Sequence, residues 1–333
     1  MKVRARRFIL KFPSVRLTRD WLKSIRFKKY EDVSLYRLLK IFGKNIQENE
    51  IVTRANGVSF NFILAIFPAI IFVFTLIPYI STYFPTINNE AIIEFIKTIL
   101  PGKMEEAVST TIEDIVHNQR GGLLTFGFFF ALFLSTNGMM SLMSAFNACY
   151  KTVEKRNVFK MRLTAIGLTF MLAAVVFLSI TLLVVGQITI DYISQNLSDF
   201  RQISWDQYTL YVILTLRFVV IFIMFFIAIS SIFYFGPAIH YNWRFFSIGS
   251  TFSTFACLAV SYGFSYYITN FGTYNKVYGS IGVLIALMIW IQLLTIILLF
   301  GYEINASLHQ GRKFEAVDSH KRTKRMEQLK MVE

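Results

Sequence analysis

The sequence predicts an all-α membrane protein with six transmembrane helices and both termini on the cytoplasmic side. The first observation is composition, because 55% of the 333 residues are apolar and only 16% are charged, against about 25% charged residues in soluble domains. The second is that apolar runs of about twenty residues recur along the chain, and runs of this length belong in lipid. The third is that basic residues gather on alternate loops, which orients the helices.

Six segments are long and apolar enough to cross a bilayer. About twenty helical residues, each rising about 1.5 Å, cover a hydrocarbon core of about 30 Å. The predicted spans are Ser59–Ile80, Leu123–Met143, Leu163–Val185, Val212–Phe235, Phe245–Ile268 and Ile281–Ile304. Together they predict a membrane domain over residues 55–308.

Charge in the connecting segments predicts the orientation of the spans. Residues 1–58 hold fifteen basic and five acidic residues, whereas residues 81–120 hold three basic and six acidic. Residues 147–162 hold five basic residues and one acidic residue, whereas residues 186–211 hold one basic and three acidic residues. The segment from residue 305 onward holds seven basic residues. Since Lys and Arg favour cytoplasmic loops, we expect a protein of the bacterial cytoplasmic membrane with both ends inside. The same bias accounts for most of the net charge of +14.

Three segments outside the spans have patterns of their own. Residues 1–54 form a basic region in which an amphipathic helical part, residues 17–47, is predicted to lie on the inner leaflet; a solvated helical tail is the alternative. Residues 89–118 show apolar residues at helical spacing on both sides of a Pro-Gly pair, which predicts two short helices capping the outer face. The charge-rich residues 309–333 are expected to be disordered.

Polar residues inside the predicted spans are candidates for a polar path, because such groups are costly in lipid and often functional. The candidates are Asn61, Pro68, Asn137, Arg217 and Gln292. Two prolines in the first span favour a bent helix that lines a cavity, with packing alone as the alternative. Arg217 falls in the outer half of the membrane, where it either lines a cavity that favours anions or extends outward to the surface.

A second set of polar residues falls at the predicted cytoplasmic edge, namely Arg54, Arg162, Glu303 and Asn305. By depth, Arg54 or Arg162 suits Glu303 as a partner. Arg217 is on the order of 20 Å away from Glu303 along the membrane normal, so Arg217 is expected at one polar level and Glu303 with Arg54 at another. A structural anchor that braces helix ends is the alternative for Glu303.

The sequence predicts no enzyme, no cofactor and no metal site. The histidines are scattered and form no cluster with carboxylates of the kind that a catalytic metal needs; they are His117, His240, His309 and His320. Cys149 and Cys257 lie in apolar segments without zinc-type spacing. No phosphate-binding loop or nucleophile motif occurs. Nucleic acid is not an expected partner, because the basic residues follow the membrane topology.

Four groups of residues carry a resemblance to a known family. They are Arg54-Ala-Asn-Gly-Val-Ser-Phe with Phe67-Pro68; Ser135 to Asn147 with Tyr150, Glu154, Arg156 and Arg162; Pro237, Trp243 and Gly249; and Tyr278-Gly279-Ser280-Ile281-Gly282 with Trp290 and Gly301-Tyr302-Glu303-Ile304-Asn305. Together they resemble the BrkB/YihY family of bacterial inner-membrane proteins, over about residues 50–310. Tyr302 and Asn56 stand where the family pattern has small residues.

The resemblance implies six spans and cytoplasmic termini. Members of the family have been described as virulence or serum-resistance factors, as transporter-like proteins and, under an older name, as ribonuclease BN. From the residues we expect a transporter, or a protein that translocates lipids or anionic solutes, with a non-transporting scaffold or envelope-resistance factor as the alternative. Membrane lipids, anionic ones among the candidates, are the expected partners. Small residues in the second span suit either a homo-oligomer or internal packing: Gly138, Ser141, Ser144 and Ala145.

Overall fold

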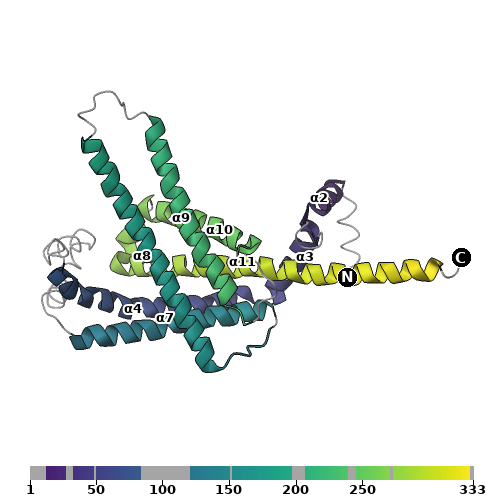
Figure 1. Cartoon of the computed structure of the whole chain (residues 1–333), viewed down its shortest axis with the longest axis horizontal. Coiled ribbons are helices and arrows are strands. Elements are labelled where there is room, and N and C mark those ends of the chain that lie inside the picture. Colours follow the sequence, from purple (N-terminus) through teal and green to yellow (C-terminus); the bar gives the residue numbers. More distant parts are fainter. Residues whose placement is uncertain are drawn as a thin grey trace.

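The described part of the chain is nearly all helical (Figure 1). The computed structural model describes residues 13–27, 33–48, 50–83, 121–150, 152–196, 207–238, 245–270 and 273–330. Its helices are α2 (Pro13–Ser24), α3 (Leu35–Glu48), α4 (Ile51–Tyr83), α7 (Gly121–Cys149), α8 (Val158–Asn196), α9 (Gln207–Phe235), α10 (Ile248–Asn270) and α11 (Thr273–Lys330). The predicted outer cap, residues 89–118, lies outside the described residues.

Five of the described helices are long and apolar enough to cross a membrane, and each overlaps a predicted span. The segments are Ile51–Val73, Gly121–Cys149, Val158–Ser179, Phe218–Phe235 and Leu284–Phe314. The fifth predicted span coincides with α10, which is helical but rich in Ser, Thr and Tyr and is not among the five. The chain is therefore a multi-pass membrane protein, and a count of six spans remains a prediction.

The long helices pack as two sets that cross each other. In Figure 1, α4, α7, α10 and α11 run in roughly the same direction, whereas α8 and α9 are steeply inclined to them. The most extensive packing joins α4 to α7, followed by α10 to α11, while α8 contacts α7 and α9 contacts α10. The close α4–α7 contact agrees with the small residues of the second span, since a Cβ on Gly138 would lie 2.7 Å from the ring of Phe62.

The buried core lies where α4, α8 and α10 begin and α7 and α9 end; we call this the core end. Its centre is an aromatic cluster in which Phe146 of α7 stacks on Tyr302 of α11 with ring centroids 4.2 Å apart, and Phe233 of α9 packs edge-on against both rings. Tyr302 is only 2% exposed. This large side chain, in a position where the family pattern has a small one, therefore fills the junction of three helices.

The N-terminal region packs against α11. Strands β1 (Arg26–Phe27) and β2 (Val33–Ser34) form a two-stranded antiparallel sheet. Ser34 then caps α3, because its Oγ accepts a hydrogen bond from the amide of Arg37 at 3.3 Å. Helix α3 contacts α11, with the ring of Phe42 edge-on to that of Phe300.

The structure corrects two expectations from the sequence. The small β1–β2 sheet departs from an all-α fold; its strands are two residues long, too short for a period-two pattern to be visible. Residues 309–330, expected to be disordered, continue α11 as helix. Part of the reason is that the N-terminal region packs on the first turns of this extension. The packing is so close that a Cβ added to Gly311 would lie 2.9 Å from the side chain of Val33. Helix α4 continues through Pro68 and Pro78, and a bend at these prolines stays a prediction.

Candidate functional site

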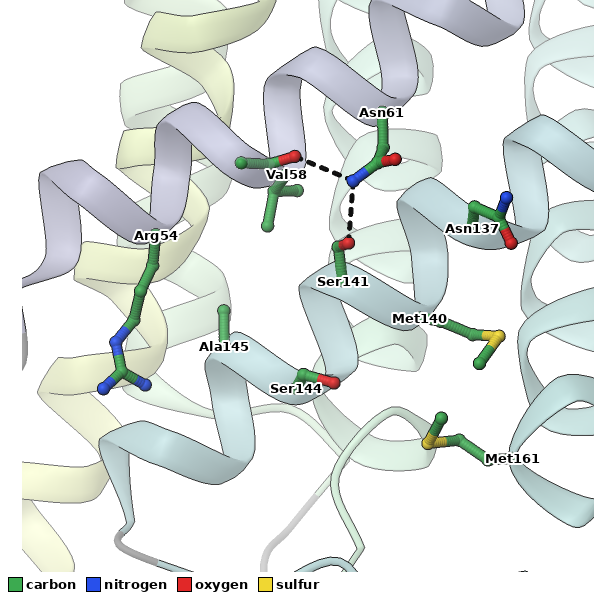
Figure 2. A pocket seen from close by; sticks show the side chains of 10 residues that line it. Arg54, Val58, Asn61, Asn137, Met140, Ser141, Ser144, Ala145 and Met161 are labelled. Carbon is green, nitrogen blue, oxygen red and sulfur yellow. Dashed lines mark hydrogen bonds between the residues drawn. The ribbon is translucent and has the colours of Figure 1, made fainter. Parts of the chain in front are cut away.

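A pocket of about 570 Å³ lies between α4, α7 and the start of α8 (Figure 2). Its lining combines one cation, several amides and hydroxyls, and a few apolar side chains: Arg54, Gly57, Val58 and Asn61 from α4, Asn137, Met140, Ser141, Ser144 and Ala145 from α7, and Met161 from α8. The pocket thus brings together Asn61 and Asn137 of the predicted polar path with Arg54 of the predicted edge cluster.

Arg54 supplies the charge of the pocket. It lies one turn into α4, where its amide donates to the carbonyl of Glu50 at 3.1 Å, and its side chain is half-buried. Within the part of the chain that the structure describes, no carboxylate forms an ion pair with Arg54. The positive charge of the guanidinium is therefore available to a ligand.

Asn61 and Ser141 connect the two helical walls of the pocket. The Asn61 Nδ2 donates to Ser141 Oγ at 2.9 Å and to the carbonyl of Gly57 at 2.9 Å, and both bonds are drawn in Figure 2. Small residues on α7 let the two helices approach closely enough for this bond. Asn61 is thereby held at the α4–α7 contact with its other amide atom, Oδ1, still able to accept.

Arg162 does not line the pocket, but it holds the side chain of Asn137, which does. From the first turns of α8 its Nη1 donates to Thr136 Oγ1 at 2.9 Å and to Asn137 Oδ1 at 2.8 Å. Its guanidinium also lies 4.9 Å from the centroid of the Phe133 ring, a cation–π contact. Arg162 was expected near Glu303 by depth, but in the structure it binds the middle of α7.

Glu303 lies in a separate, fully buried cluster at the core end. Its side chain is 0% exposed and accepts from Asn45 Nδ2 at 2.6 Å and from Ser307 Oγ at 3.3 Å. Asn45, which also donates to Gln310 at 3.1 Å, comes from α3, so this cluster attaches the N-terminal region to α11.

Asn305 joins α11 to α10. Its Oδ1 accepts from the amide of Gly249 at 2.8 Å, and its Nδ2 donates to Ser247 Oγ at 2.8 Å. Ser247 in turn caps α10 by accepting from the amide of Ser250 at 3.1 Å. Gly249 and Gly301 make the crossing close, since a Cβ on Gly249 would lie 2.0 Å from the Gly301 carbonyl oxygen.

The loop between α7 and α8 is attached to the end of α9 through Glu154. The Nε and Nη2 of Arg156 each donate to this carboxylate at 2.9 Å, and Asn147 Nδ2 donates at 2.8 Å. Arg156 Nη2 also donates to the carbonyl of Gly236 at 2.7 Å, and Asn147 Oδ1 accepts from the amide of Ala238 at 2.8 Å. The hydrogen-bonded Arg156 guanidinium and amide, with Asn147, hold the pKa of the Glu154 carboxyl below its ordinary value.

The remaining predicted residues lie away from the pocket or beyond what is described. Gln292 of α11 donates through Nε2 to Asn56 Oδ1 at 2.8 Å, an α11–α4 contact. Pro68 is buried within α4 and does not line the pocket. Arg217 belongs to α9, and the position of its side chain lies outside the described residues.

Sequence reasoning did not select Gly57, Met140, Met161 or Asn45. Gly57 directly follows the Arg54-Ala-Asn motif, and this motif was the feature of the sequence that could have pointed to Gly57 as a pocket residue. The two methionines are common apolar residues, and their place in a pocket wall depends on how α8 crosses α7. Asn45 lies in a basic helix outside the membrane domain, and nothing in its neighbours indicates a buried partner 258 positions later.

The comparisons with known proteins place the chain in a family. The sequence profile described as Virulence factor BrkB matches residues 42–326. The chain belongs to the BrkB family. It is 31% identical over 261 residues to the ribonuclease-like protein YfkH of Bacillus subtilis, covering 78% of this chain and 91% of YfkH. It is 22% identical over 274 residues to a UPF0761 membrane protein of Actinobacillus pleuropneumoniae, covering 81% and 93%. No solved structure matches it.

The BrkB family match covers every helix that lines the pocket. A shorter match, 35% identical over 72 residues, is to a UPF0761 membrane protein of Tolumonas auensis and covers 22% of this chain and 24% of that one. These relatives are named as membrane proteins, and the ribonuclease-like name belongs to YfkH. Across the described residues, no group of three or more His, Cys, Asp or Glu is placed to hold a metal ion. That the chain is not an enzyme stays a prediction.

Proposed function

We propose that this BrkB-family protein binds an anionic lipid or solute in the pocket between α4, α7 and α8 and moves it across the membrane. The observation that carries the proposal is the charge of the pocket. Arg54 lines it, and no ion pair from a described carboxylate neutralises Arg54. Partly burying a cation without a counter-charge is unfavourable, so an anionic ligand would be stabilised there.

The size and lining of the pocket support a small-molecule or headgroup ligand. Its volume of about 570 Å³ falls inside the range of about 300–1,000 Å³ typical of ligand sites. Polar groups occupy both of its long walls, with Asn61 on α4 and Asn137 on α7. Met140 and Met161 add soft apolar surface that adapts to irregular shapes. A scaffold whose spans pack tightly would not need such a space.

The proposed topology has six spans with both termini in the cytoplasm of a bacterial cell. Helix α10 is the fifth of the six spans in this arrangement, because its 23 residues are enough to cross a bilayer of about 30 Å at about 1.5 Å per residue. Labelling of an introduced cysteine, beside the buried native Cys149 and Cys257, tests the orientation. Val153 is 76% exposed in the α7–α8 loop, so Val153→Cys should react with an impermeant thiol reagent only after the cells are opened. Labelling in intact cells would contradict a cytoplasmic loop.

Flux in reconstituted liposomes tests the translocation itself. The full-length protein is placed in liposomes, and labelled anionic, zwitterionic and cationic lipids and solutes are followed across the membrane. We expect anions to move faster than in protein-free liposomes, and Arg54→Ala to reduce that flux at least about tenfold, as for the loss of a charged hydrogen bond of about 1.5–3 kcal/mol. Lys160→Ala is the matched control, because Lys160 is an exposed cation nearby on α8 that does not line the pocket.

Two outcomes would overturn the proposal. Anion flux equal to that of protein-free liposomes across the whole panel would favour a non-transporting scaffold. An equal loss of anion flux in Arg54→Ala and in Lys160→Ala would show that the net charge of this part of the protein, rather than the pocket, determines the flux.

A further inference from the structure

Hydrogen bonds around the pocket decide which polar atoms face into it. The Arg162 guanidinium carries only donors, so the Asn137 atom that meets it at 2.8 Å is the acceptor, Oδ1. The amide nitrogen of Asn137 therefore points elsewhere, and among the residues that the structure describes it meets no acceptor. Asn137 lines the pocket, and these two N–H donors have no acceptor among the described residues.

The opposite wall is fixed in the same way. The Asn61 Nδ2 donates to a backbone carbonyl, which only accepts, and to Ser141 Oγ. Ser141 therefore uses an oxygen lone pair for Asn61 and keeps its hydroxyl proton to donate. Asn61 Oδ1 remains as an acceptor. With Arg54 and Ser144, the pocket offers several donors, one positive charge and one amide acceptor.

The charged and the amide ends of the pocket are separated along the helices. Arg54 and Asn61 are seven positions apart on α4, which is about 10 Å at the helical rise. Figure 2 shows Arg54 at one end of the pocket and Asn137 at the other, with Ser141 and Ser144 between them. A single small oxyanion would reach only one end, so a ligand that uses the whole lining needs an anionic group with a polar extension.

We propose that the ligand is a phosphate ester of a polyol, such as a phosphoglycerol group, with the phosphoryl oxygens at Arg54 and the hydroxyls at Ser141, Asn137 and Asn61. The inference rests on the proposed function for its choice of site. The Arg guanidinium fork matches phosphoryl oxygens, and a hydroxyl both donates and accepts, which suits a wall that has donors and one acceptor. Arg162 is a positioning residue that keeps the Asn137 donors turned toward the ligand.

Binding to the full-length protein in phosphatidylcholine nanodiscs tests this ligand class by calorimetry. The soluble arm compares glycerol 3-phosphate with inorganic phosphate, glycerol and glycerate, a carboxylate with a similar polyol. The lipid arm compares nanodiscs that contain phosphatidylglycerol with nanodiscs that contain phosphatidic acid, and scores retention of each lipid by mass spectrometry. We expect glycerol 3-phosphate to bind at least about tenfold more tightly than phosphate or glycerate, which corresponds to about 1.4 kcal/mol. If the lipid is the source, phosphatidylglycerol is retained in preference to phosphatidic acid.

Asn137→Asp is the decisive variant. It keeps an oxygen for Arg162 but replaces the two N–H donors with an anionic oxygen, so binding should fall at least about tenfold. Asn56→Asp makes the same isosteric change outside the pocket, where Oδ1 accepts from Gln292, and should bind as the wild type does. Unfolding midpoints of both variants check that each is folded.

Each result separates this inference from the proposed function. Tight binding without flux supports the ligand class and overturns translocation. Anion flux without binding of glycerol 3-phosphate or phosphatidylglycerol leaves translocation standing and overturns the ligand class. Equal affinity for phosphate and glycerol 3-phosphate, or unchanged binding in Asn137→Asp, would also overturn it.

Discussion

The close crossing of α10 and α11 can be tested by replacing Gly249 with Ala. An added Cβ would lie 2.0 Å from the carbonyl oxygen of Gly301 and 2.7 Å from the side chain of Asn305, whereas ordinary contacts begin near 3.4 Å. The backbone oxygen cannot rotate away as a side chain could. Helix α10 would therefore have to move from α11 by about 1.4 Å, the difference between 3.4 and 2.0 Å.

That displacement gives the expected magnitude. It stretches two buried hydrogen bonds, from the Gly249 amide to Asn305 and from Asn305 to Ser247, each 2.8 Å long. Each buried hydrogen bond contributes about 1 kcal/mol, and overpacking a core costs about 1–3 kcal/mol. We therefore expect Gly249→Ala to lower the free energy of unfolding by about 3–5 kcal/mol, the sum of two bonds and the packing term.

The assay is thermal unfolding of the purified protein in nanodiscs, with Gly263→Ala as the matched control. Gly263 lies in the same helix, but a Cβ there meets nothing within 4 Å, so its change to Ala should be neutral or stabilise by about 0.5–1 kcal/mol. Gly249→Ala should unfold well below both the wild type and the control. If Gly249→Ala and Gly263→Ala have the same unfolding midpoint, the steric reasoning is wrong.

Two further predictions concern polar groups at the core end. The pKa of Glu154 is lowered in the folded protein. The stabilisation that its carboxylate gives the folded state is therefore fully present above the ordinary glutamate pKa of about 4.3, and it is lost as the pH falls through the lowered value. The unfolding midpoints of wild type and Glu154→Gln should thus differ at neutral pH and converge in acid; a constant difference would contradict the role of the carboxylate. Asn45→Ala removes a 2.6 Å bond to the buried Glu303 and should cost about 1–3 kcal/mol, with faster hydrogen exchange in α3. Unchanged exchange in α3 would mean that this bond does not hold the N-terminal region.

Much of the membrane architecture could be predicted from the sequence, because hydropathy acts over whole segments. Each of the five candidate spans overlaps a predicted one, and the small residues of the second span do pack closely on α4. Pairing between helices could not be predicted, because it depends on rotation about the helix axis. Depth alone suggested Arg54 or Arg162 as a partner for Glu303, but Arg162 faces Asn137 and Glu303 faces Asn45. Asn61 and Asn137, both predicted for a polar path, do line the same pocket.

The residues that carry the family resemblance in α11 are explained by packing rather than by the pocket. Successive helical residues are rotated by about 100°, so a run of five residues faces every side. Accordingly, Gly301 meets α10, Tyr302 stacks on α7 and Glu303 binds α3, while none of the three lines the pocket. Variants in this run should therefore change stability, whereas altered ligand selectivity at constant stability should arise only from pocket residues such as Arg54 and Asn137.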